Sequence, residues 1–525
     1  MLSHLCGFSC EREAVAVHTL RRAVAPLRSA QATGLSLSAF VAAGDGSWKR
    51  ASLLRAIGVS CSAALLSACA SFSQDGGLGA VGAAARSELG HDAVVLRTPE
   101  EASDNSARVA HLLSGSLTPA KAVEIALRSN RGLQAAYNRL GVAEAIKIRE
   151  SLPPNPRVSL GGIAGSLSAE IEAAVAADIL ALATLPARAE IAADRFEAAQ
   201  LEAAEATLRV AAEARRSYYR AVAARAQVRI IERIALSADV AAKLARQLDE
   251  TGAMNRLDEA RDQLVKEEIA AKLTTARKSE IAERERLVRA LGLLEDNLSQ
   301  ALPAALPALP ARPLATPSVE REAVEQRLDL QAARKELSAL AKSLGLSSST
   351  RFLDAFQLSA LGKITREDVG SEKVQFNDAG AGATIEIPIF DLGETRVREA
   401  EQRWLEAANL LAERMVNVRS QAREAYQSYR AAHDIAMRHQ RSIAPLHELI
   451  SAESLKRYNA MIVDVFVLLE DARRRAQASI AAIEAKRDFW LADVELRVAI
   501  RGGGFPPAEG KAVKASVADN ERDQP

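Results

Sequence analysis

Residues 187–251 decide the fold. They read ARAEIAADRFEAAQLEAAEATLRVAAEARRSYYRAVAARAQVRIIERIALSADVAAKLARQLDET, without glycine or proline, and 21 of the 65 residues are alanine, the strongest helix former. The stretch predicts an unbroken helix, which at 1.5 Å per residue is roughly 98 Å long. Such a helix needs a partner along its whole length. Gly252 ends it, and residues 257–293 predict the antiparallel partner.

The same plan occurs a second time in the chain. Residues 394–444 contain no glycine or proline over 51 positions, a turn follows near 459–461, and a returning helix is expected to reach residue 500. The starts and the ends of the two long helices are related by nearly the same offset: 207 from Ala187 to Glu394, and 208 from Gly252 to Ala460. We infer an internal duplication.

A shorter helix and a β-hairpin precede each long pair. Thr118 and Pro119 predict the start of the first helix, as N-cap and first helical residue. Alternation of Ile385, Ile387 and Ile389 with other residues predicts a strand, whereas residues 174–177 fit a strand or a helix. The expected organisation is a first repeat at 117–300 (hairpin 157–185, helix pair 187–293), a proline-rich linker at 301–318, a second repeat at 319–501 (hairpin 348–390, helix pair 394–500) and a disordered tail at 502–525.

The N-terminal part predicts export. Residues 48–68 combine a basic start, an apolar run and small residues, as a lipoprotein signal peptide does. The run Leu66, Ser67, Ala68, Cys69 resembles a bacterial lipobox, in which Cys69 is the lipidated first residue of the mature protein. The alternative is an ordinary signal peptide with an incidental cysteine. We expect a gene-start artefact or disorder over 1–47 and a lipidated flexible leader over 69–116.

Composition and motifs exclude several classes of function. The formal net charge is +1, and without a run of basic residues this gives no reason to expect nucleic acid as a partner. No cysteine follows Cys69, so the mature chain has no thiolate metal site. No catalytic motif is found, and we expect no enzyme activity, no cofactor and no metal. We expect solvent-exposed surface histidines at His433, His439 and His447, and interhelical packing for Tyr218, Tyr219, Tyr426 and Tyr429.

The strands and the long helices together predict a membrane-spanning tube. A four-stranded sheet in a bilayer leaves unpaired backbone groups at its edges, and closed barrels need about eight or more strands. Three chains supply twelve strands, so we expect a homotrimer with a shared transmembrane β-barrel and a long α-helical barrel. The fold class is therefore mainly α with a small β part. The low aromatic content of 4% suits the closely packed helices of such a wall.

Four short motifs, in the correct order over residues 117–501, resemble those of TolC-like outer membrane factors. These proteins are the exit ducts of tripartite efflux pumps and type I secretion systems. Leu328 and Ala460 or Met461 depart from the family, which prefers proline and glycine there. The motifs are Leu117 to Leu127 at the start of the first repeat, Arg327 to Ala333 at the start of the second, Ile387 to Gly393 before the long helix, and Arg457 to Val465 at the helix tip.

The resemblance implies a passive duct in the outer membrane, lipid-anchored, with a long periplasmic extension. Its implied partners are two further copies of the chain, a periplasmic adaptor, an inner-membrane RND or ABC pump, and outer membrane lipid. The implied helix tips, where the adaptor docks, are Gly252, Met254, Asn255, Asn459, Ala460 and Met461.

The sequence allows two roles for each of two residues in the second helix pair. Asp464 either contributes an acidic ring at the pore entrance or caps the returning helix. Pro445 either bends the helix inward towards the tip or marks a local irregularity.

Two rival functions stay open at this point. One is a lipid-anchored periplasmic coiled-coil adaptor, which should carry a lipoyl-like β domain within one hairpin. The duplicated hairpins argue against it. The other is a lipid-anchored enzyme, which the missing catalytic motifs disfavour. The transported substrate is not specified by the sequence.

Overall fold

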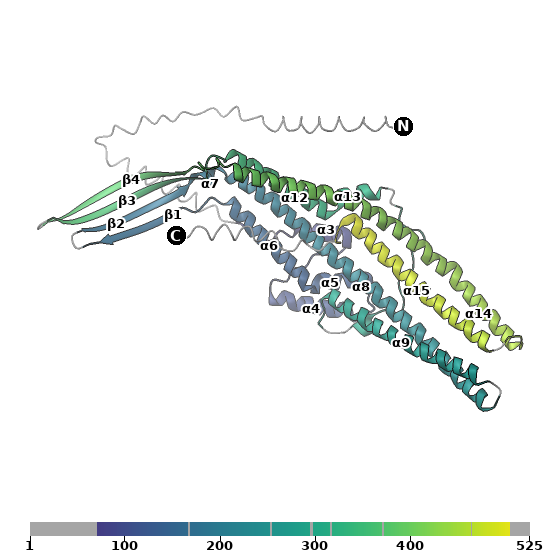
Figure 1. The fold of residues 1–525 in the computed structure, drawn as a ribbon. Coiled ribbons are helices and arrows are strands. Elements are labelled where there is room, and N and C mark those ends of the chain that lie inside the picture. Colours follow the sequence, from purple (N-terminus) through teal and green to yellow (C-terminus); the bar gives the residue numbers. More distant parts are fainter. Residues whose placement is uncertain are drawn as a thin grey trace, which may run out of the picture. The chain divides into compact units, whose positions relative to one another are not determined.

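The computed structural model describes residues 71–165, 168–252, 255–294, 298–315, 318–369, 372–463 and 465–504. These residues belong to one compact unit, Ala70–Pro525. The described part is mainly helical, with one four-stranded sheet (Figure 1). The predicted segments 1–47 and 48–68, together with Cys69, lie outside the described residues.

The first repeat begins where the sequence predicts it. The Thr118 side chain accepts a hydrogen bond from the Lys121 amide, and Pro119 occupies the first turn. The elements of this repeat are α5 (Pro119–Ser129), α6 (Arg131–Ser151), β1 (Arg157–Ala164), β2 (Ser168–Asp178), α7 (Ile179–Ala183), α8 (Leu185–Glu250), α9 (Arg256–Leu291) and the short α10 (Leu298–Ala301).

The second repeat follows the same order, as the duplication predicts. Its elements are α11 (Val319–Gln326), α12 (Leu328–Ser349), β3 (Ala355–Val369), β4 (Glu372–Glu386), α13 (Glu394–Arg438), a π-helical segment η2 (His439–Ile443), α14 (Ala444–Asn459) and α15 (Val465–Arg501).

Helix α8 is unbroken over 66 residues, as its composition predicts. It packs against its partner α9 and against α6, α12 and α15 (Figure 1). Its buried face is rich in alanine, and Ala211 and Ala214 are fully buried. Small side chains let the neighbouring helices approach closely. Helix α8 is therefore the helix against which elements of both repeats pack.

The short helix that precedes each hairpin is broken once, which the sequence did not predict. One residue in an extended conformation separates two helices, Asn130 with ψ 110° in the first repeat and Arg327 with ψ 123° in the second. The Asn130 side chain accepts from the Leu133 amide and donates to the Ala290 carbonyl. Capping and contact with α9 thus compensate for the interrupted helix.

Helix α13 passes into α14 through the π-helical segment His439–Ile443, just before Pro445. Proline has no amide hydrogen and its ring clashes with the carbonyl four residues earlier. The wider π turn absorbs that conflict. Pro445 therefore marks a local irregularity of the helix, and the predicted inward bend stays a proposal.

The two hairpins form one antiparallel sheet in the order β1-β2-β3-β4. Residues 174–177, which fit a strand or a helix by sequence, belong to β2. Strand β4 ends at Glu386, so Ile387 and Ile389 lie beyond the strand that their alternation predicted. Pro388 stands between them and cannot donate to a strand neighbour.

The segment predicted as a flexible leader contains two helices, α3 (Gly79–Leu89) and α4 (Pro99–Leu113). Val81 of α3 is fully buried, in a cluster with Phe196 of α8. Thr98 and Glu101 form a capping box at the start of α4. This Thr-x-x-Glu pattern can be recognised in the sequence, and it could have predicted the start of α4.

The linker between the repeats is ordered by side chains of the long helices. We call residues 302–314 the strap. Its backbone makes five hydrogen bonds with these side chains, which come from both repeats. The bonds run from Arg225 to the Leu302 carbonyl (2.9 Å), Lys486 to Leu306 (3.1 Å), Trp490 to Pro307 (3.2 Å) and His433 to Pro310 (3.1 Å), and from the Leu314 amide to the Tyr429 hydroxyl (3.1 Å).

One predicted surface histidine is buried instead. His433 is only 4% exposed and packs edge-on against Phe489 at 5.6 Å between ring centres. The prediction that His433 is solvent-exposed was wrong, because the strap covers α13 where His433 lies. Tyr218, Tyr219 and Tyr429 are buried between helices, as predicted.

Candidate functional site

The sheet has two chemically different faces. Pairing places Ile171 opposite Ile364 and Val175 opposite Ala360, so side chains of the same kind share a face across the strands. Although they are apolar, the side chains of this face are exposed. They include Val158, Leu160, Ile171, Val175, Leu358, Ile364 and Ile385. Because these side chains are exposed in the described part of the chain, this apolar area is a surface suited to an apolar environment or partner.

The opposite face of the sheet is more polar, although Ile163 and Phe376 also lie on it. Glu172 lies opposite Lys363, and Glu170 opposite Thr365. The Lys363 ammonium also forms an ion pair of 3.0 Å with Glu170. Because successive strand residues point to opposite faces, the alternation gathers the Glu170, Glu172 and Lys363 side chains on one side and the apolar side chains named above on the other.

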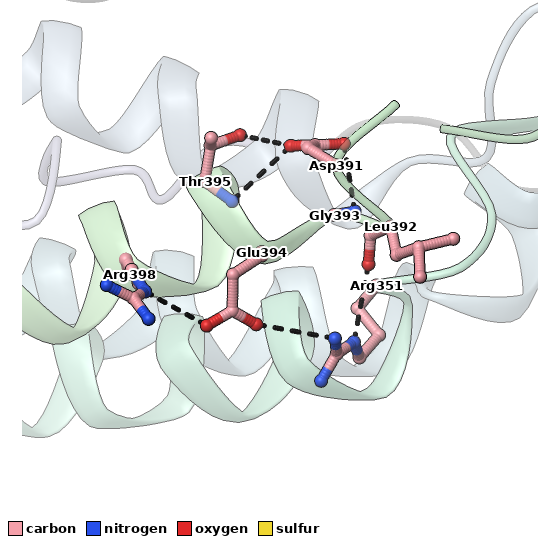
Figure 2. Close-up of polar contacts among 7 residues, drawn as sticks. All are labelled: Arg351, Asp391, Leu392, Gly393, Glu394, Thr395 and Arg398. Atoms are coloured by element: carbon pink, nitrogen blue, oxygen red, sulfur yellow. Dashed lines mark hydrogen bonds and ion pairs between the residues drawn. The ribbon is translucent and has the colours of Figure 1, made fainter. Parts of the chain in front are cut away.

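A compact junction connects the sheet to α13, and Figure 2 shows its polar contacts. The Asp391 carboxylate accepts hydrogen bonds from the Gly393 amide (3.0 Å) and from the amide and hydroxyl of Thr395. These donors, the Thr395 hydroxyl first, hold the pKa of the Asp391 carboxyl below its ordinary value. Asp391 therefore caps the start of α13 as a charged group.

The other side of the junction connects the segment after α12 to α13. Glu394 accepts hydrogen bonds from Arg398, one turn later, at 2.9 Å and from Arg351 at 3.3 Å (Figure 2). Arg351 also reaches the Leu392 carbonyl at 3.4 Å. The two ends of the β3–β4 hairpin are thus held together at its base.

Gly393 is required at this junction for two reasons. Its φ is +72°, which side chains disfavour. A Cβ at this position would also lie 2.0 Å from the Arg351 carbonyl oxygen. The preceding Leu392 has a φ of +52° as well, so two successive residues adopt the left-handed conformation in this turn.

The first helix turn joins α8 to α9. Gly252 has a φ of +72° and its amide donates to the Asp249 carbonyl at 2.9 Å. Asn255 lies directly before α9, and its carbonyl accepts from the Glu259 amide at 3.2 Å. Met254 lies outside the described residues. The structure thus places Gly252 and Asn255 in the turn where the sequence predicts them.

The second helix turn joins α14 to α15. Asn459 ends α14, Ala460 follows, and Met461 has a φ of +58°. The amides of Met461 and Ile462 donate to the carbonyls of Tyr458 and Arg457, both at 2.9 Å. This is a Schellman turn, in which glycine is usual at the left-handed position.

The side chains at this second turn are solvent-exposed. Met461 is 94% exposed and Ile462 is 71% exposed. Met461 takes the backbone conformation of the glycine that the sequence lacks. Asp464 lies outside the described residues, so both of its interpretations stay predictions.

The described part of the chain has neither a metal-binding cluster nor a helix suited to span a membrane. No group of three His, Cys, Asp or Glu side chains is arranged there to hold a metal ion. No helix there is long and apolar enough to cross a membrane.

Comparison with solved structures identifies the fold. The outer membrane protein VceC of Vibrio cholerae superimposes with a TM-score of 0.59 at 17% identity, covering 78% of this chain and all of VceC. The outer membrane channel MtrE of Neisseria gonorrhoeae, in its open state, gives 0.60 at 17% identity, covering 73% of this chain and 88% of MtrE. The chain has the fold of an outer membrane channel.

The outer-membrane channel OprN gives a TM-score of 0.59 at 19% identity, over 80% of this chain and 95% of OprN. The predicted resemblance to TolC-like outer membrane factors is thus confirmed at the level of the fold. No protein-family model and no curated protein sequence matches the chain.

Proposed function

We propose that the chain is the outer membrane channel of a tripartite efflux pump or a type I secretion system. It would act as a passive exit duct across the periplasm and the outer membrane. The observation that carries the proposal is the two-faced sheet on a channel fold, with apolar side chains exposed on one face and charged side chains on the other. The likeness to outer membrane channels supports this function over the adaptor hypothesis.

The assembly follows from the edges of the sheet. Strands β1 and β4 each pair on one side within the chain, so each offers an edge to another copy. A bilayer does not tolerate open sheet edges, and we propose that three copies close one barrel of twelve strands. Its apolar face would contact lipid and its polar face would line the duct.

The long helices would form the periplasmic wall. Leu236, Val240 and Leu244 make an exposed stripe on α8 at four-residue spacing, and Leu446 and Leu449 make another on α14. Such stripes are suited to helix packing between copies. With 66 residues, α8 alone is about 99 Å long, enough to carry the duct deep into the periplasm.

The two helix turns are the proposed docking site of a periplasmic adaptor linked to an inner-membrane pump. Gly252 and Met461 give both turns the same left-handed conformation, which supports equivalent roles in the two repeats. Asp464 would stand at the pore entrance if its side chain faces the duct. We propose no catalytic role and no cofactor for these residues.

Lipidation of Cys69 is part of the proposal. It would add an acyl anchor in the outer membrane, while the barrel inserts by itself. A Cys69→Ala variant should therefore lose the lipid but keep outer membrane location and trimers.

The test is fractionation of cells that express the full chain, followed by gel migration without heating. We expect a heat-dissociable trimer in the outer membrane, for the wild type and for Cys69→Ala. A Cys69→Ala protein that is a soluble monomer would contradict the proposed channel function. Susceptibility profiling of a deletion strain would then identify the class of transported compounds.

A further inference from the structure

A cluster of charged side chains joins the two repeats in the interior. Arg327, at the break between α11 and α12, is only 2% exposed. Its guanidinium donates to the Asp329 carboxylate at 2.9 and 3.2 Å and to the Gln421 side-chain oxygen of α13 at 2.9 Å. Glu205 of α8 completes the cluster from the first repeat.

Glu205 is the least well satisfied member of this cluster. Its Oε1 atom is inaccessible to solvent and has no hydrogen-bond partner within the described residues. Burial, and next the charge of Asp329, raise the pKa of the carboxyl to about 7, although Arg209 and Arg327 oppose the shift. Glu202, one turn earlier on α8, adds a smaller upward contribution. From α13, the neutral Gln421 reaches the cluster through Arg327.

The backbone at the end of α15 packs against this cluster. Gly502 and Gly503 both have positive φ, +104° and +93°. A Cβ on Gly502 would lie 3.7 Å from the Glu205 Cγ atom and 3.5 Å from the Leu328 nitrogen. A Cβ on Gly503 would lie 2.9 Å from the Arg209 nitrogen. The backbone after α15 is therefore seated against α8 and the start of α12, and neither glycine carries a charge that could pair with Glu205.

We call the contact of α8 with the start of α12 and with Gly502 the joint between the repeats. We propose that Glu205 makes this joint pH-sensitive: the joint is closed when the Glu205 carboxyl is protonated and loosened when the carboxyl is charged. A buried carboxylate whose Oε1 has no partner among the described residues bears a desolvation cost, which Arg209 and Arg327 offset only in part. The neutral acid avoids that cost, so contacts of α8 with the start of α12 and with Gly502 are firmer at low pH. This property is independent of the proposed channel function.

The sign of the effect follows from proton linkage. The closed joint holds the Glu205 proton up to about pH 7, whereas an open joint releases it near the ordinary value for glutamate. Protection of the joint should therefore be greatest at low pH, fall as the pH rises towards about 7, and then level off. Between pH 8 and pH 6 the closed state gains about tenfold over the open state.

Hydrogen exchange of the full-length chain in detergent tests the proposal. After correction for intrinsic exchange rates, amides at 327–331 and 501–504 should exchange about tenfold more slowly at pH 6 than at pH 8. Glu205→Gln should remove this dependence and keep exchange slow at both pH values. Glu190→Gln, on the same helix with a side chain 70% exposed, should behave as the wild type.

A second variant covers the case in which Glu205→Gln does not fold. Asp329→Asn removes the charge that, after burial, contributes most to the raised pKa of Glu205, so the transition in the exchange profile should move to lower pH. A wild-type profile that is flat between pH 5 and pH 8 would overturn the proposal. So would a Glu205→Gln profile that keeps the wild-type dependence, or an Asp329→Asn transition at unchanged pH.

Discussion

The indole nitrogen of Trp490 on α15 donates a hydrogen bond of 3.2 Å to the carbonyl oxygen of Pro307 in the strap. Trp490 also stacks on Tyr219 of α8, with ring centres 5.3 Å apart. One side chain thus links the last helix of the second repeat to the first repeat and to the linker between them. Four of the thirteen strap residues are proline and lack an amide hydrogen, and side chains from the helices fix the course of the strap.

Replacing Trp490 by phenylalanine should destabilise the chain by about 1–2 kcal/mol, because the Pro307 carbonyl loses its donor in a half-buried place. Chemical denaturation in detergent measures the effect. Trp404→Phe is the control, since the Trp404 indole makes no hydrogen bond in the described structure. Equal effects of the two substitutions would show that the bond to Pro307 contributes nothing beyond ring packing.

Gly393→Ala should destabilise the strand–helix junction by more than about 2 kcal/mol, because it combines a positive φ with a steric clash against the Arg351 carbonyl. Gly90→Ala is a matched control. Gly90 has a similar φ of +70°, and a Cβ there meets nothing within 4 Å, so only the conformational cost of about 1 kcal/mol remains. The yield of heat-dissociable trimer and the unfolding midpoint report both effects. A Gly393→Ala variant no worse than Gly90→Ala contradicts the clash.

Met461→Gly should stabilise the second helix turn by about 0.5–1 kcal/mol, since glycine adopts a φ of +58° without strain. Gly252→Met is the mirror change and should destabilise the first turn by about 1 kcal/mol. Thermal unfolding in detergent compares the pair. If the exposed Met461 side chain docks an adaptor, Met461→Gly should also weaken adaptor binding in a pull-down although the fold becomes more stable. Unchanged stability in both variants would show that the turns carry no strain.

Neighbouring residues of β2 test which face of the sheet meets lipid. Ala173 lies on the apolar face, opposite Gly362, and Ala174 on the polar face, opposite Leu361. Ala173→Lys should destabilise the protein in a bilayer by about 2–4 kcal/mol and reduce the amount of trimer in the outer membrane. Ala174→Lys should insert normally and change single-channel conductance. The reverse pattern would exchange the lipid and duct faces.

Much of the fold follows from local rules. The alanine-rich composition of α8 and the absence of glycine and proline predict its length almost to the residue, and the repeat offset predicts the second helix pair. Thr118 and Gly252 mark a helix start and a helix end through their own chemistry. These features depend on neighbours along the chain, so the sequence suffices.

Other features depend on contacts between distant residues. The breaks at Asn130 and Arg327 occur where side chains meet α9 and α13, and His433 is buried because the strap crosses it. Helix α3 is stable because α8 offers a surface for Val81. No local pattern carries this information, apart from the capping box at Thr98.

By itself, the sequence determined the length of the helices, the duplication and the position of both turns, because helix propensity and turn chemistry act over a few residues. Only the tertiary structure decided that the linker is fixed as a strap, that His433 is buried beneath it, and that Glu205 lies close to Asp329 and Arg327 in a buried joint. The physical reason is that burial and electrostatic interaction depend on distance in space, and residues that meet there, such as Trp490 and Pro307 or Glu205 and Asp329, lie far apart along the chain.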